Sequence, residues 1–190
     1  VRKIPAGGVA PRLAAPAGRG QPVAVAGCTL YAAACSVPFA LDKYLGAAKA
    51  ILPSTRITLH GLKDREEKDD FLAGVKGLHL YGKSLLYLVS RALDDERKMP
   101  LLGLDRAVTP GWEMDGDQWA ASQLPSVQQW QAQFKGQVMP VPTPSVVVNK
   151  KGKTAQAQHG SFDNSVAVIE QTIGRIRGAK VVAPIEWLDY

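Results

Sequence analysis

Short apolar runs alternate along this chain with segments of helical spacing, and this alternation limits the fold more than any other feature. The run "VAVAGCTLYAAA" is continuously apolar, as is typical of a strand buried on both faces, and "TRITLHGL" is β-branched and strand-like. Helical spacing of apolar residues follows in "ALDKYLGAAKAIL" and in "SVQQWQAQF". Strands that alternate with such helices predict an α/β fold with a mostly parallel sheet and helices on both faces.

Local signals place further elements. The segment "SLLYLVSRAL" is expected to be a helix with Ser84 as its N-cap, and "TPSVVVNK" to be a strand. The charged stretch "DREEKDD" and the stretch "KGKTAQAQHG" read as loops. The last helix should end at Gly178, with these residues on one face: Phe162, Val166, Ile169, Ile173 and Ile176.

Composition divides the chain into a tail and one domain. Residues 1–20 are rich in Pro, Gly, Ala and Arg without apolar periodicity, which predicts a flexible tail. Residues 21–190 are enough for one domain with a sizeable core. The net charge is +6, but the positive residues are scattered rather than gathered into a stripe with aromatics. We therefore expect no nucleic-acid partner.

The uncharged stretch from Gly20 to Leu41 raises the question of a membrane segment. Its "VAGC" resembles a lipoprotein cleavage box, but the only apolar stretch between Arg19 and Cys28 is "PVAVAG", which is too short for a signal peptide's apolar region. A membrane span would need about 20 strongly apolar residues. We expect no membrane span and a cytoplasmic protein. The two cysteines, Cys28 and Cys35, fit no zinc or redox spacing, and no cofactor or metal motif is present.

Residues 77–84 read "GLHLYGKS", a literal match to the nucleotide-binding pattern G-x-x-x-x-G-K-[ST]. A phosphate-cradling loop needs small residues and a buried strand before it, whereas this one has a bulky interior and a charged approach. Asp105, after "MPLLGL", would be the magnesium-side carboxylate. The favoured alternative is that Gly82 forms a turn, Ser84 caps a helix and Lys83 is solvated.

Polar residues that directly follow strands deserve the closest inspection, because ligands of parallel sheets bind beyond the carboxyl ends of the strands. Asp64 follows "RITLHGL", Asp105 follows "PLLGL", and His159 lies between the "PSVVV" strand and the last helix. A carboxylate followed by a histidine is the order found in α/β-hydrolases, where the histidine accepts the nucleophile's proton. A single loop histidine is more often exposed or structural, and His60 and His79 take that interpretation.

Several blocks together resemble the C-terminal half of a bacterial α/β-hydrolase family of serine hydrolases. They are "CTLYAAACSVPFA", "LKDREEKDD", "YGKSLLYLVSRAL", "PLLGLDRAV" and "HGSFDNSVAVIEQTIGRIRG", within residues 27–188. The resemblance implies that Asp64 is the acid and His159 the base, and that "GKS" begins a helix. Asp69, Asp70 and Asp105 compete for the acid role, Asp105 most strongly because it directly follows a strand-like run.

The chain departs from the family at the nucleophile, because it contains no G-x-S-x-G pentapeptide. Cys28 is the alternative nucleophile, although Leu30 stands two residues later, where an elbow needs a small residue. We therefore expect the C-terminal portion of a hydrolase, acting on an ester or other acyl substrate when complete and inactive alone. An exposed sheet edge would favour self-association. The alternative is a non-catalytic α/β interaction module.

Overall fold

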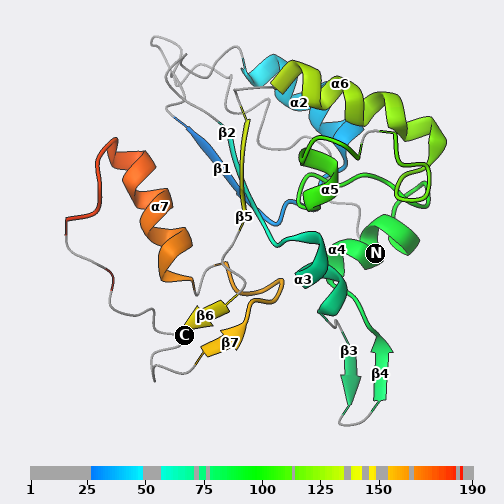
Figure 1. The fold of residues 1–190 in the computed structure, drawn as a ribbon. Helices are drawn as coiled ribbons and strands as arrows, with labels where there is room; N and C mark the ends of the chain where they lie inside the picture. Colours follow the sequence, from blue (N-terminus) through cyan, green and yellow to red (C-terminus); the bar gives the residue numbers. More distant parts are fainter. Residues whose placement is uncertain are drawn as a thin grey trace, which may run out of the picture.

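The computed structural model describes residues 27–48, 57–70, 73–75, 78–112, 114–134, 138–142, 146–148, 154–162, 165–182 and 185. The expected tail at residues 1–20 lies outside this part of the chain. The elements in chain order (Figure 1) are β1 (Cys28–Tyr31), α2 (Val37–Ala48), β2 (Ile57–Gly61), α3 (Asp64–Asp69), β3 (Ala73–Val75), β4 (Leu78–Tyr81), α4 (Leu85–Leu88), the π-helix η1 (Val89–Leu93), α5 (Asp105–Val108), the 3-10 helix η2 (Ala121–Gln123), α6 (Leu124–Phe134), β5 (Val138–Pro142), β6 (Val146–Val148), β7 (Thr154–Gln156) and α7 (Val166–Arg177).

A small parallel sheet lies between the helices, with its strands in the order β1-β2-β5. Ile57 of β2 pairs with Cys28 of β1 on one edge and with Val138 of β5 on the other. Because all three strands run in one direction, their carboxyl ends lie at the same edge of the sheet. The remaining strands form two antiparallel pairs, β3 with β4 and β6 with β7. The predicted α/β class and the parallel pairing are confirmed.

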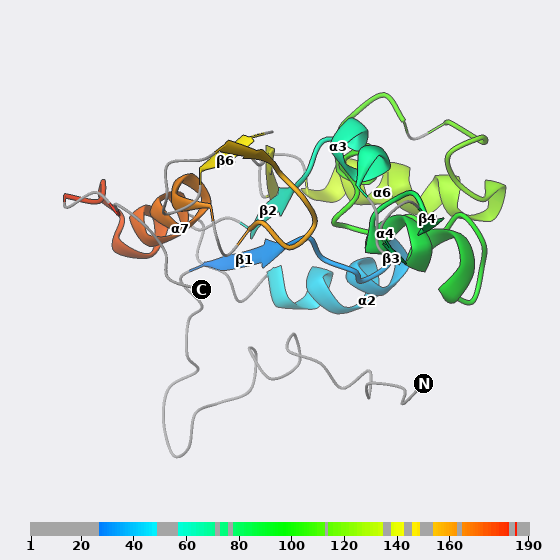
Figure 2. The same ribbon diagram turned by 90° about the horizontal axis from the view of Figure 1, so that it is seen from below.

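The two faces of β2 meet different partners, as the alternation of side chains along a strand requires. Ile57 and Leu59 are 3% and 4% exposed and belong to the main core, together with residues of α2 and α6. On the other face, Thr58 accepts a hydrogen bond from Arg175 of α7. The hydroxyl groups of Tyr31 and Thr172 lie 2.6 Å apart, which joins β1 to the same helix. Figure 2 shows α7 on the side of β1 away from α2.

Gly103 marks the closest approach between chain segments in the core. An added Cβ there would lie 2.7 Å from the backbone of Ala32 and Ala33 and 2.7 Å from a methyl carbon of Leu86. The backbone N–H of Gly103 donates to Ala33 O at 2.8 Å. The apolar run before Asp105 is therefore a buried turn pressed against the exit of β1, rather than a regular strand.

Ser84 is the N-cap of α4, as predicted, and its hydroxyl accepts a hydrogen bond from the backbone N–H of Tyr87. The stretch "DREEKDD" was expected to be a loop, and this was wrong because residues 64–69 form α3. A stretch of charged residues shows no apolar helix face in the sequence. The face that this helix buries carries Glu66 and Glu67, which are 8% and 0% exposed. The second expected loop, "KGKTAQAQHG", contains β7, which pairs with the predicted strand at β6.

The final helix is shorter than its apolar spacing suggests. Phe162 precedes α7 in a loop, where it is 5% exposed and packs with Leu62 and Ala157. Ile176, which was expected on the buried face, is 80% exposed, while Val168 is 1% exposed. Gly178 ends the helix as predicted, in the left-handed conformation with φ of 65°.

No helix in the described ranges has both the length and the apolar character that crossing a membrane requires.

His60 lies in β2, where its imidazole is buried without a hydrogen-bond partner among the described residues. Its side chain is 1% exposed, and neither ring nitrogen has a hydrogen-bond partner among the described residues. The Tyr31 ring packs on it with ring centroids 5.3 Å apart. Burial, reinforced by the charge of Arg175, lowers the pKa of His60 to about 4. The imidazole is therefore neutral in the folded protein at neutral pH.

This burial predicts a loss of stability in mild acid. The unfolded state binds a proton near the ordinary pKa of 6.5, whereas the folded state binds it only near pH 4. The free energy of unfolding should fall by about 3 kcal/mol as the pH drops through that window. Urea unfolding at a series of pH values would measure it. His60→Leu should remove most of this slope, and equal slopes in wild type and His60→Leu would contradict the prediction.

Candidate functional site

His159 lies in a turn beyond the carboxyl ends of β1 and β2. The loop of residues 157–162 is anchored there by Ala157 and Phe162, which pack with Leu62 just after β2 and with Ala32 just after β1. The rings of His159 and Phe162 meet edge to face, with centroids 6.4 Å apart. The loop therefore places an imidazole at the edge of the sheet where the strands end.

The end of α3 fixes the backbone of this turn. The N–H of His159 donates to a carboxylate oxygen of Asp70 at 2.9 Å. A second hydrogen bond, from the N–H of Gln158 to the Ser161 hydroxyl at 2.8 Å, closes the turn itself. Asp70 was one of the alternative acids. In the structure, its carboxylate accepts the hydrogen bond from the backbone N–H of His159.

The carboxylate beside the His159 ring belongs to Glu67. Its Oε1 lies 3.9 Å from Nδ1 of His159, which is ion-pair distance when the ring is protonated. The Glu67 side chain is 0% exposed, and neither of its carboxylate oxygens has a hydrogen-bond partner among the described residues. Burial of an unpaired carboxylate is strongly unfavourable, so the neighbouring imidazole is the group that can compensate it. The His159 side chain is 24% exposed, while its Nδ1 is buried.

Asp64, the predicted acid, is directed to other partners. Its carboxylate is 2.7 Å from Lys68 Nζ and 2.8 Å from an Arg106 guanidinium nitrogen, and it accepts a hydrogen bond from the Tyr87 hydroxyl. Burial alone would raise the pKa of Asp64, but the hydrogen bonds from Lys68 and Tyr87 and the charges of Lys68 and Arg106 outweigh it and lower that pKa. These two cations hold the side chain between α3 and α5, so the structure does not bring Asp64 to His159.

The other candidates also lie apart from the His159 ring. Asp105 accepts a hydrogen bond from the Thr109 hydroxyl at 2.6 Å and another from the Asp64 N–H at 3.4 Å. Asp69 pairs with the exposed Arg65. Cys28 is the first residue of β1, at the end of the strand opposite the His159 turn. Burial raises the pKa of its thiol, which disfavours the nucleophilic thiolate.

The nucleotide-binding pattern does not form a phosphate-cradling loop. Leu78–Tyr81, its interior, forms β4 and pairs with β3, so this stretch is extended instead of being wrapped around a ligand. Lys83 Nζ lies 5.3 Å from the centroid of the Tyr87 ring. With Ser84 as a helix cap, this geometry agrees with the turn-and-cap interpretation.

Sequence reasoning missed Glu67, the carboxylate that the fold places nearest the His159 ring. One signal was available: Glu67 lies three residues after Asp64, which is within reach of the same helix face if "DREEKD" is read as a helix. Within the described ranges, no three His, Cys, Asp or Glu side chains gather closely enough to hold a metal ion.

No family model matches this chain, and no curated protein and no solved structure matches it either.

The Asp64 cluster predicts a specific loss of stability. Asp64→Asn leaves Lys68 without its carboxylate and Arg106 with only the longer contact to Asp115 at 3.9 Å, and it should reduce the free energy of unfolding by about 2 kcal/mol at pH 7. Because the pKa of Asp64 is lowered, its contribution is present above the ordinary carboxyl pKa and is lost as the pH falls below it. Chemical denaturation would measure both effects. Asp69→Asn is the matched control, since its pair with Arg65 is exposed and should be worth less than about 0.5 kcal/mol. Equal losses in the two variants would refute a special role for the cluster.

Proposed function

We propose that this chain carries the histidine–carboxylate part of an α/β-hydrolase site, and that it acts on ester or other acyl substrates when a nucleophile stands beside His159. The observation that carries the proposal is the 3.9 Å approach of the buried Glu67 carboxylate to Nδ1 of His159, beyond the carboxyl ends of a parallel sheet. Ligand and catalytic sites of open α/β sheets occupy that edge.

The chemistry follows from the two nitrogens of the imidazole. A carboxylate facing Nδ1 favours the tautomer with its proton on Nδ1, which leaves Nε2 as a lone-pair base. Nε2 would remove the proton from a hydroxyl or thiol nucleophile as that group attacks an acyl carbon. The same nitrogen would then protonate the leaving group. Glu67 would stabilise the imidazolium formed between these two steps.

Glu67 takes the acid role in this proposal in place of Asp64. Two cations already neutralise Asp64, at 2.7 and 2.8 Å, so its charge is committed to linking α3 with α5. Glu67 has no such partner among the described residues. Asp70 supports the arrangement by holding the backbone of His159.

The order of elements supports a partial hydrolase-like sheet with helices on both faces. A strand, β2, leads into the acid-bearing α3, and a later strand of the same sheet, β5, precedes the histidine loop and the last helix. The contacts of β2 with the α2 side and the α7 side fit this arrangement. We propose the class from this order and from the sequence resemblance.

The nucleophile is the part of the site that the chain does not provide in recognisable form. No G-x-S-x-G stretch is present, and Cys28 lies at the far end of β1. Loss of the nucleophile alone removes most of a triad's catalysis, on the order of a million-fold in turnover. The chain alone is therefore expected to be inactive.

A second candidate function is that of a non-catalytic interaction module. The unpaired outer edge of β1 in the described sheet favours it. β1 is the outermost strand of the order β1-β2-β5, and no strand among the described residues pairs with its outer side. Unpaired strand edges recruit strands of other chains. Association that grows with concentration in light scattering, without labelling by a fluorophosphonate, would favour this candidate.

The acid assignment predicts which variant disturbs the imidazole. Long-range ¹H–¹⁵N NMR spectra of His159 should show the tautomer protonated at Nδ1 in the wild type. Glu67→Gln should mix the two tautomers, because the negative charge beside Nδ1 is gone. Asp64→Asn is the matched control and should leave the His159 signals unchanged. The assignment fails if Asp64→Asn changes the tautomer and Glu67→Gln does not.

The activity prediction is tested with short p-nitrophenyl esters. The chain should show no hydrolysis above the His159→Ala variant, since no nucleophile is placed beside the base. Hydrolysis that survives in His159→Ala would overturn the site. Hydrolysis that is lost in both His159→Ala and Cys28→Ser would identify Cys28 as the nucleophile.

A further inference from the structure

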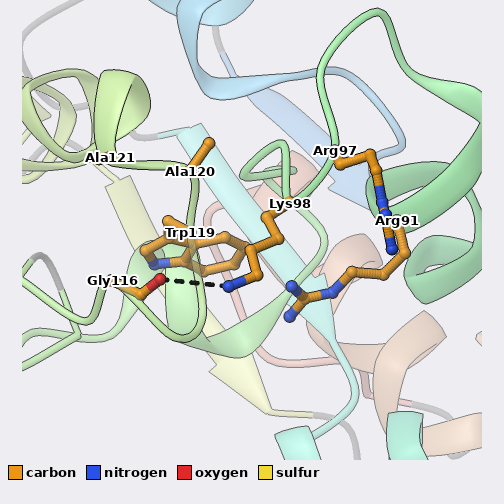
Figure 3. A pocket seen from close by; sticks show the side chains of 7 residues that line it. All are labelled: Arg91, Arg97, Lys98, Gly116, Trp119, Ala120 and Ala121. Atoms are coloured by element: carbon orange, nitrogen blue, oxygen red, sulfur yellow. Dashed lines mark hydrogen bonds between the residues drawn. The ribbon is translucent and has the colours of Figure 1, made fainter.

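A pocket of about 390 Å³ lies away from the histidine site, between η1 and the segment before α6. Arg91, Arg97 and Lys98 line it together with Trp119, Gly116 and the alanines at 120 and 121. Figure 3 shows the guanidinium of Arg91 directed toward the Lys98 side chain, while the ammonium of Lys98 points toward the carbonyl oxygen of Gly116 beside the Trp119 ring. No acidic side chain is among the described residues that line this pocket.

The three cations lack carboxylate partners in the described part of the chain. Arg91 lies over the Tyr87 ring, with its guanidinium carbon 5.7 Å from the ring centroid. Lys98 donates to a neutral acceptor, the carbonyl oxygen of Gly116, at 3.3 Å. Arg97 makes no hydrogen bond or ion pair with any described residue. Gathered cations repel one another and create a local positive potential, which a bound anion relieves.

The nearby carboxylate of Glu96 is engaged elsewhere. It accepts hydrogen bonds from the Ser122 hydroxyl and from the Gln123 side-chain amide. These hydrogen bonds lower the pKa of Glu96, so it remains ionised while bound to these neutral donors. Because Glu96 accepts hydrogen bonds from Ser122 and Gln123 rather than pairing with Arg97, the adjacent Arg97 is available to a ligand.

The backbone holds the cations in place before any ligand arrives. Ser90 and Met99 are joined twice, by Ser90 Oγ donating to Met99 O at 2.7 Å and by Met99 N–H donating to Ser90 O at 3.1 Å. Arg91 and Lys98 are the sequence neighbours of this pair and are therefore brought together. Lys98 has a left-handed backbone with φ of 64°, which is uncommon for a residue with a side chain. The N–H of Ala120 donates to Lys98 O at 3.2 Å, so the backbones of these two pocket-lining residues are linked directly.

We infer that this pocket binds a small molecule through its phosphate group. Guanidinium groups match phosphate oxygens with paired N–H donors, and an ammonium adds a compact charge. Three unneutralised cations suit the two or more negative charges of a phosphate better than the single charge of a carboxylate. The volume lies in the range of pockets that hold small organic ligands, which leaves room for more than the phosphate itself. The site is separate from residues 77–84 and does not depend on the hydrolase proposal.

Calorimetric titration with sodium pyrophosphate at constant ionic strength tests the inference on the full chain. Binding should be saturable and should raise the melting temperature. Arg97→Ala should weaken it at least about ten-fold, the loss expected for a charge-assisted contact. Arg97 makes no hydrogen bond or ion pair with described residues that this change would break. Arg177→Ala, which removes an exposed charge at the end of α7, is the matched control and should bind as the wild type does.

Three results would overturn the inference. One is the absence of saturable binding, and another is unchanged affinity in Arg97→Ala. The third is an equal loss in Arg97→Ala and Arg177→Ala, which would show attraction to the overall positive charge rather than to this pocket. Arg91→Lys adds a geometric readout: it keeps the charge and should still weaken binding, because a single ammonium cannot offer paired donors.

Discussion

The double-sided pairing of β2 is the constraint on which the rest of the structure depends. Hydrogen bonds to β1 and β5 fix both of its edges, so its residues must alternate between two environments. One face supplies Ile57 and Leu59 to the main core, and the other supplies His60 and the Thr58 contact with α7. The end of this strand therefore determines where α3 begins and where the loop bearing His159 is anchored.

From that position, helix α3 contacts α4, α5 and the His159 turn. Its first residue, Asp64, joins it to α5 through Arg106 and to α4 through Tyr87. Its other end holds the His159 turn, through Asp70 and the buried Glu67. The carbonyl of Glu67 also accepts the N–H of Ser84 at 2.9 Å, which connects the helix cap of α4 to the same place. A helix of six residues, all of them charged, is thus stabilised by its contacts with neighbouring elements, since such a short helix is marginal alone.

The features that the sequence predicted are those determined by neighbouring residues. Ser84 as a cap and Gly178 as a helix end depend on local chemistry, and both were found. Glu67 could not be singled out in the same way, because the imidazole that it faces lies in a loop about 90 residues later. Phe162 continues the helical spacing of α7 but packs at the end of the sheet, so tertiary contact overrode periodicity. Strand β5 was not predicted, because Pro140 and Pro142 interrupt its strand pattern. Prolines are tolerated there because β5 is an edge strand of the described sheet.

The direction of the Arg91 side chain depends on the number of residues in the π-helix η1, which contains it. A wide turn accommodates an extra residue relative to an α-helix, and this wide turn at Val89–Leu93 follows α4 directly. Removal of one residue there would restore regular winding without breaking the helix. The side chains before and after the deletion would keep their directions, because the wide turn had already absorbed the extra residue. A single-residue deletion within Val89–Leu93 would therefore change only which side chains occupy the turn that holds Arg91.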